Sequence, residues 1–217
     1  MVAAFGLIDI QYAKTLFRTQ RDEFYLLVIT LLLTLFLGIT QGIVLGVLLS
    51  LLLMVVRTSK PHHAVLGRIK GTQYYKNKER FEEDIQIDPE LLVFRFDAQL
   101  FFGNRDYFKT VLTQTALQKG KELKGIILVA RGITYIDSSG LSMLQAIIKS
   151  FKQKGVRFMV AGAIGPARDI LHKSQLDQII GKDNFFAKTS DAVDDFKGIT
   201  YPSEIQKKVS NQTSSSD

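Results

Sequence analysis

The feature that most constrains this chain is a segment without any charged residue, from Phe24 to Val56. As one helix its roughly 33 residues would be about 50 Å long, well beyond a hydrocarbon core of about 30 Å. We therefore predict two short membrane spans of about 14 to 17 residues each, interrupted around Gly38–Gly42. One steeply tilted span is the alternative. A buried helix of a soluble protein is disfavoured, because so long a segment has no place in a domain this small.

Glycine spacing inside this segment adds a weaker signal. Gly38, Gly42 and Gly46 recur every four residues, which lets two membrane helices approach closely. Such spacing is common in membrane helices by chance. Before the segment, Met1–Ile8 lacks the basic opening and cleavage site of a signal peptide and is predicted as the end of a helix. Gln11–Glu23 is predicted as an interfacial or cytoplasmic connector.

Basic residues follow the charge-free segment directly, beginning with Arg57 and Lys60. Positive charge this close to a span marks the cytoplasmic side, so the rest of the chain is expected in the cytoplasm. These residues could also contact anionic lipid headgroups. The formal charge of +7 raises nucleic acid as a partner. We reject nucleic acid because acidic residues alternate with the basic ones and no recognition module is present.

Residues after Asp88-Pro89 alternate between strand and helix patterns. The predicted strands are Leu91–Phe96 (half-buried), 100–102, 125–130 (buried on both faces), 156–161 and an edge strand at 185–187. Helices are predicted from Tyr107 to Gly120, from 141 to 152, from Ala167 to Ser174 and around 192–196. This order predicts an α/β fold with a mixed, mostly parallel sheet and helices packed on it, preceded by transmembrane helices. The first two strands would form an antiparallel edge.

The domain organisation follows from these patterns. Residues 1–60 are predicted as the membrane part, 61–88 as a basic linker, 89–198 as the α/β domain and 199–217 as a disordered tail. The absence of cysteine excludes disulfides, thiolate nucleophiles and cysteine metal sites. His62 and His63 are adjacent, so they do not converge on one metal ion, and we interpret them as a solvated pair. No metal site and no cofactor are expected.

The candidate site is Asp137-Ser138-Ser139-Gly140, where the buried strand 125–130 is followed by a helix. Asp or Ser at this position caps free backbone N–H groups, and the helix dipole favours an anion there. An exposed serine on this turn could carry a phosphate. The local pattern alone favours helix capping as the only role of these residues.

The same residues and their flanks resemble a known family. Ile136–Leu141, between a buried strand and an amphipathic helix, resembles the signature of STAS domains, which occur in anti-sigma-factor antagonists and at the C-terminus of sulfate permease (SulP) anion transporters. The upstream residues favour the transporters. The supporting matches are Val55-Val56-Arg57, Pro61, Leu66-Gly67-Arg68, Thr72, Tyr75, the F-x-N-x-x-Y-F-like element Phe101–Phe108 and the G-P-V-R-D-x-L-like element Gly165–Leu171.

This resemblance implies the last spans and the cytoplasmic STAS domain of a multi-pass anion transporter, with sulfate as the expected anion, in the inner or plasma membrane. Family members hold the anion between helices that lie earlier in the sequence, so no substrate-binding residue is expected here. The expected partners are the lipid bilayer, the remaining membrane domain, an unknown cytoplasmic protein and a second copy of the chain. No catalytic carboxylate pair, nucleophile–base set or metal cluster is present, so we predict no enzyme.

A second interpretation belongs to another functional class. In the soluble relatives the serine before the glycine is the phosphoacceptor, and that serine is Ser139 here. The chain would then be a membrane-tethered phosphoswitch. The sequence leaves open the anion, the coupling ion, the STAS partner, the oligomeric state and whether the chain comes from a truncated or a split transporter.

Overall fold

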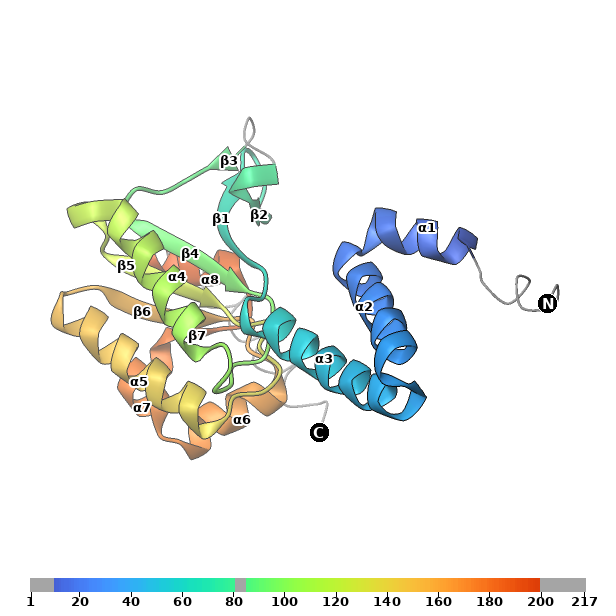
Figure 1. Cartoon of the computed structure of the whole chain (residues 1–217). Coiled ribbons are helices and arrows are strands. Elements are labelled where there is room, and N and C mark those ends of the chain that lie inside the picture. Colours follow the sequence, from blue (N-terminus) through green and yellow to red (C-terminus); the bar gives the residue numbers. More distant parts are fainter. Residues whose placement is uncertain (1–9, 81–84, 200–217) are drawn as a thin grey trace. The chain divides into compact units, whose positions relative to one another are not determined.

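The computed structural model describes residues 10–80 and 85–199 and divides the chain into two compact units, Met1–Thr58 and Ser59–Asp217 (Figure 1). We describe each unit by itself. The predicted helical end at residues 1–8 and the predicted tail from residue 200 onward lie outside the described residues.

The first unit contains three helices: α1 (Ile10–Thr19), α2 (Arg21–Leu37) and α3 (Ile39–Ser59). The predicted interruption is present, but it is confined to Gly38, whose φ of 91° suits a residue without a Cβ. Residues 39–42, predicted inside the interruption, are helical. Among the described residues, α3 is the one helix long and apolar enough to cross a membrane. The two-span interpretation stays a prediction.

The second unit is built on one mixed sheet in the order β2-β1-β4-β5-β6-β7, with β3 paired to β1. Strands β4 to β7 are parallel, and β1 pairs antiparallel with β2, β3 and β4. The strands are β1 (His63–Ile69), β2 (Tyr75–Asn77), β3 (Ile85–Gln86), β4 (Leu91–Phe96), β5 (Gly125–Val129), β6 (Arg157–Ala161) and β7 (Phe185–Phe186).

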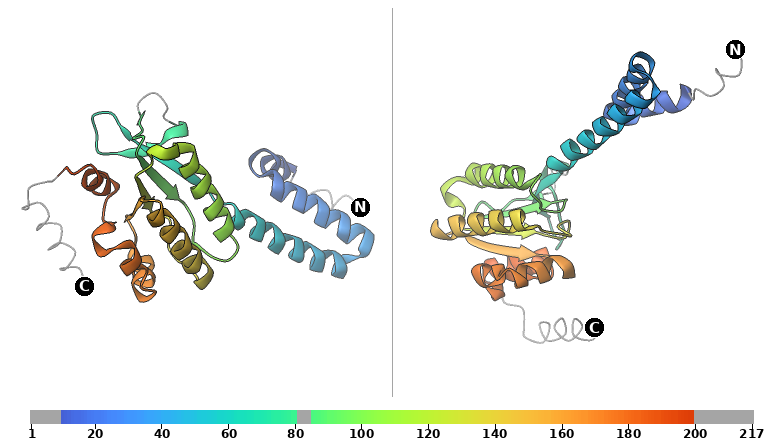
Figure 2. Two further views of the ribbon diagram at one scale, coloured as in Figure 1. Left: turned by 90° about the vertical axis from the view of Figure 1, so that its left-hand side faces the viewer. Right: turned by 60° about the horizontal axis from the view of Figure 1, so that its bottom comes forward.

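Helices cover both faces of this sheet. On one face α4 and α5 lie side by side, followed by α6 and α7, and on the other face α8 packs (Figure 2). The helices are α4 (Arg105–Lys119), α5 (Ser138–Gln153), α6 (Gly165–Lys173), α7 (Leu176–Ile180) and α8 (Thr189–Phe196), with 3-10 turns at Lys78–Arg80, Gly120–Glu122 and Lys182–Asn184. The predicted mixed, mostly parallel sheet with packed helices is confirmed.

Strand β4 corrects one prediction, because it is buried on both faces. Leu92, Phe94 and Phe96 face the core under α4 and α5, as expected from their alternation. Leu91 and Val93 face a second core that α8 closes. The sequence predicted a half-buried strand because the helix that covers the second face lies about one hundred residues later.

Two further predictions are wrong. Residues 61–88, predicted as a linker, contain β1, β2 and β3, and β1 is the strand that forms the antiparallel pairing with β4. Basic residues in this segment conceal the buried alternation of Ala64 and Leu66.

Residues 100–102 do not form a strand. Leu100 makes a single bridge to Ile136, and the chain then turns into α4. Helix α7 was not predicted, since five residues carry too little periodicity.

Candidate functional site

The predicted residues Asp137 to Gly140 lie at the start of α5, just beyond the carboxyl end of β5. Asp137 is the N-cap, and its Oδ1 accepts a hydrogen bond of 2.7 Å from the Gly140 N–H. The other carboxylate oxygen, Oδ2, accepts a bond of 2.9 Å from the Phe102 N–H. Both oxygens of Asp137 are therefore engaged with the backbone, one within its own turn and one on the loop that precedes α4.

The loop before α4 is held against the α5 turn by further bonds. The Leu100 N–H donates to the Tyr135 carbonyl at 2.9 Å, and the Asp137 N–H donates to the Leu100 carbonyl at 3.0 Å. Asn104 is fully buried, where its side chain accepts from the Phe101 N–H and donates to the Gln99 carbonyl. The two loops thus form one rigid platform at the carboxyl ends of β4 and β5.

Gly140 is required by the close approach of these loops. A Cβ at this position would lie 2.9 Å from the Leu100 carbonyl oxygen and 3.0 Å from Ile136 Cγ2. Both values are shorter than ordinary van der Waals contacts. The glycine of the predicted motif therefore has a packing role, which the sequence pattern did not specify.

The two serines of the motif are accessible to different degrees. Ser138 is exposed and Ser139 is half-buried, and they are the first two residues of α5. Within the part of the chain that the structure describes, neither side-chain hydroxyl has an assigned hydrogen bond. A phosphate on either serine would lie beside the unpaired N–H groups of the first helical turn.

Two aromatic side chains on this platform were not predicted as site residues. Phe102 is 71% exposed and Tyr135 is 50% exposed, and each lies on one of the two joined loops. A weak signal was available, because aromatic residues beside a turn motif are either buried in the core or exposed to a partner, although single exposed hydrophobic residues are normal. Sequence alone could not separate these two cases, since the neighbouring Phe101 is half-buried.

The adjacent histidines have separate partners instead of forming a solvated pair. His62 Nδ1 lies 2.8 Å from Asp97 Oδ2, and His63 Nδ1 lies 3.2 Å from the Tyr107 hydroxyl. Burial lowers the pKa of His63, and the neighbouring His62 lowers it further. Among residues 10–80 and 85–199 no group of three or more His, Cys, Asp or Glu could hold a metal ion.

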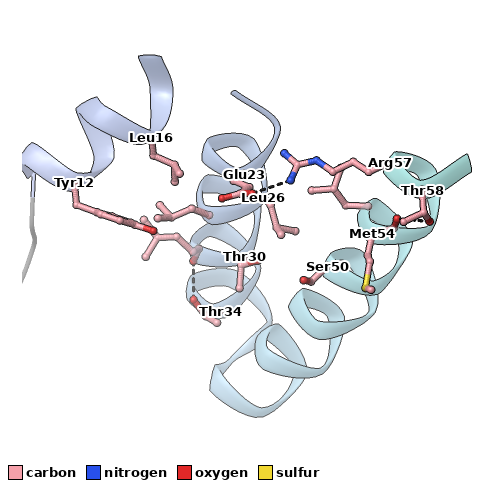
Figure 3. Close-up of a pocket in the computed structure, with 13 residues that line it drawn as sticks. Tyr12, Leu16, Glu23, Leu26, Thr30, Thr34, Ser50, Met54, Arg57 and Thr58 are labelled. Carbon is pink, nitrogen blue, oxygen red and sulfur yellow. Dashed lines mark hydrogen bonds and ion pairs between the residues drawn. The ribbon is translucent and has the colours of Figure 1, made fainter. Parts of the chain in front are cut away.

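The helical unit contains a second candidate region between α2 and α3. Near the Gly38 turn these helices are close together, because Gly42 and Gly46 are buried against Thr34 and Thr30. Toward the other end they separate and enclose a cleft of about 840 Å³ (Figure 3). Arg57 spans this end and donates to Glu23 Oε1 at 2.8 Å. The cleft walls are mainly apolar, with the hydroxyl groups of Thr30, Thr34 and Ser50 among them.

Known proteins resemble this chain over most of its length. The family model of the STAS domain matches residues 82–192. "Probable sulfate transporter 4.2" of Arabidopsis thaliana is 32% identical over 88% of this chain and 29% of its own length. "High affinity sulfate transporter 2" of Stylosanthes hamata is 28% identical over 64% of this chain and 22% of its own length. The chain thus spans less than a third of these relatives.

A solved structure shows the same fold. The murine Solute Carrier 26 family member A9 anion transporter in its inward-facing state has a TM-score of 0.77 to this chain at 20% sequence identity. The similarity covers 86% of this chain and 30% of that transporter.

Proposed function

The chain belongs to the STAS domain family, and from this premise we propose that it forms the C-terminal part of a secondary anion transporter, with sulfate as the anion. One observation carries the proposal. The similarity to the Arabidopsis sulfate transporter covers 88% of the chain, so it continues beyond residues 82–192 into the helical unit. A STAS domain of another class would not need to share these helices.

The helical unit supports a place in the membrane. Charges are absent between Phe24 and Val56, and α3 is long and apolar enough to span a bilayer. Arg57 and Lys60 follow the apolar stretch and favour a cytoplasmic position for the STAS unit. We propose a multi-pass arrangement in the cell membrane in which residues 1–60 join the rest of the transporter. The cleft between α2 and α3 would receive neighbouring helices.

The STAS unit would act without chemistry of its own. Its platform is fixed by Asp137 and Asn104 and presents Phe102 and Tyr135 to solvent. Rigid exposed aromatic groups supply large contact area at low entropic cost and are common in protein interfaces. This platform, with Asp137–Gly140 at its centre, is proposed as the surface on which a cytoplasmic protein stabilises or regulates the transporter.

Sulfate uptake tests the proposal directly. A chimera in which this chain replaces the matching C-terminal segment of a similar sulfate transporter is expected to take up radiolabelled sulfate in proteoliposomes, while the transporter without that segment is not. This chain alone is expected to give no uptake. Robust uptake by this chain alone would contradict the account, as would a correctly inserted chimera that is inactive.

The alternative function is a membrane-tethered phosphoswitch at Ser139. It is favoured by the position of Ser139 in the first turn of α5, where a phosphate would meet free N–H groups. Incubation with ATP and an extract of the host cell, followed by mass spectrometry, separates the two functions. Modification of the parent chain that is lost in Ser139→Ala and retained in Ser138→Ala supports the switch. If Ser139 stays unmodified, the switch is contradicted and only the transporter proposal remains.

A further inference from the structure

A groove on the first unit combines two cations with two aromatic rings. It has a volume of about 580 Å³ and is lined by Ala13, Lys14, Phe17, Arg18 and Phe24. Lys14 and Arg18 are four residues apart on α1 and so lie on one helix face. The groove therefore has a positively charged wall and an aromatic floor.

The aromatic floor is fixed in place by packing between α1 and α2. The rings of Phe17 and Phe24 meet edge to face, with centroids 5.1 Å apart, and Leu16 is buried. The Arg21 guanidinium lies 5.6 Å from the centre of the Phe17 ring. These contacts attach α1 to the polar end of α2, where the charge-free segment begins.

Nearby carboxylates do not neutralise the cationic wall. Asp22 and Glu23 are directed to Arg57, at 3.8 Å and 2.8 Å. Within residues 10–80 and 85–199, neither Lys14 nor Arg18 has an ion pair, and both side chains are exposed. An anionic ligand could therefore reach both cations without displacing an ion-pair partner that belongs to the described residues.

We propose that this groove binds one anionic glycerophospholipid, with its phosphate between Lys14 and Arg18 and an acyl chain against Phe17 and Phe24. The inference rests on the proposed membrane insertion of α2 and α3. The Arg57–Glu23 ion pair joins the start of α2 to the end of α3, so α1 lies at the same polar end of the hairpin as both. A lipid is the occupant that offers an anion and an apolar chain at that boundary.

Native mass spectrometry of the full chain released from mixed micelles of phosphatidylglycerol and phosphatidylcholine tests the site. We expect one retained phosphatidylglycerol that 10-fold molar excess of inorganic phosphate does not displace. Each basic residue near an anionic surface contributes about 1 kcal/mol. The double variant Lys14→Gln/Arg18→Gln should therefore weaken retention by about 30-fold, which corresponds to about 2 kcal/mol. The matched control Lys121→Gln/Lys154→Gln removes two exposed charges from the STAS unit and should retain the lipid.

A third variant distinguishes lipid binding inside the groove from lipid binding to surface charge in general. Ala13→Trp keeps both cations but fills the groove, so it should also reduce retention. If the charge variant loses the lipid but Ala13→Trp retains it fully, binding inside the groove is contradicted. Release of the lipid by inorganic phosphate would contradict it as well. A dimer that dissociates on Lys14→Gln/Arg18→Gln would assign the surface to a second copy instead. Flotation with phosphatidylcholine vesicles measures insertion of the chain into a bilayer separately. A chain that inserts but retains no phosphatidylglycerol would therefore contradict the lipid site and leave the proposed membrane insertion intact.

Discussion

Replacing Asp137 by alanine removes the side chain that joins the α5 turn to the loop before α4. The bond to the Gly140 N–H is a helix N-cap, and loss of such a cap costs about 1 kcal/mol. The bond to the Phe102 N–H involves an ionised acceptor and contributes about 1.5 kcal/mol, the low end for such bonds because Asp137 is half-exposed. Asp137→Ala should therefore lower the free energy of unfolding by about 2–3 kcal/mol.

The assay is thermal unfolding of the full chain in mild detergent, followed by near-ultraviolet circular dichroism of its 7 tyrosines, since the chain has no tryptophan. For a unit of this size about 1 kcal/mol corresponds to about 4 °C, so the melting temperature should fall by about 10 °C. Ser138→Ala, in the same turn, is the control and should change stability by less than about 0.5 kcal/mol.

Hydrogen exchange locates the effect. Peptides that contain the Phe102 and Gly140 amides should lose protection in Asp137→Ala, and Asp137→Asn should be intermediate because an amide offers one acceptor for two donors. A melting temperature within 2 °C of the parent, with unchanged protection at both amides, would refute the assignment of Asp137 as the joint between the loops.

Three other predictions concern separate parts of the chain. Gly42→Leu should destabilise the α2–α3 hairpin by at least 1–3 kcal/mol, because even a Cβ at this position would lie 2.4 Å from Thr34 Cα. Thermal unfolding in detergent measures this loss, and an unchanged melting temperature would contradict the packing. Burial lowers the pKa of His63 in the folded chain. Just below pH about 6.5 the unfolded chain therefore binds more protons than the folded chain, so the free energy of unfolding of the STAS unit should fall as the pH decreases. Urea titrations at several pH values should show this slope flattened in His63→Gln, and an equal slope would be the contrary result. The double variant Phe102→Ser/Tyr135→Ser should abolish capture of a cytoplasmic partner, while its melting temperature stays within about 2 °C of the parent chain. Full capture by this variant would show that the platform does not contact the partner.

Local patterns predicted those parts of the fold whose signal lies within one element. Strand β5 is a continuous apolar run and β6 is apolar after Arg157, and both were predicted, β5 with its burial on both faces. The cap at Asp137 was predicted for the same reason, because the strand, the turn and the helix are adjacent in the sequence. The interruption at Gly38 followed from segment length alone, although its extent did not.

Long-range contacts account for what the sequence did not predict. Strand β1 is stabilised by pairing with three other strands, and its short apolar stretch Ala64–Leu66 lies among basic residues that conceal it. The second bond of Asp137 reaches a residue 35 positions away, and the need for glycine at position 140 depends on the Leu100 carbonyl. These features exist only after the two loops have met, so a local pattern could not contain them.

The membrane placement of the two units is tested most directly by single-cysteine labelling, which the absence of native cysteine makes unambiguous. Thr40→Cys lies at the Gly38 turn and Lys154→Cys lies on the exposed surface of the STAS unit. In intact cells a membrane-impermeant maleimide is expected to label Thr40→Cys, and to label Lys154→Cys only after lysis. Labelling of Lys154→Cys in intact cells, or recovery of both variants in the soluble fraction, would contradict a membrane-inserted hairpin that carries a cytoplasmic STAS domain.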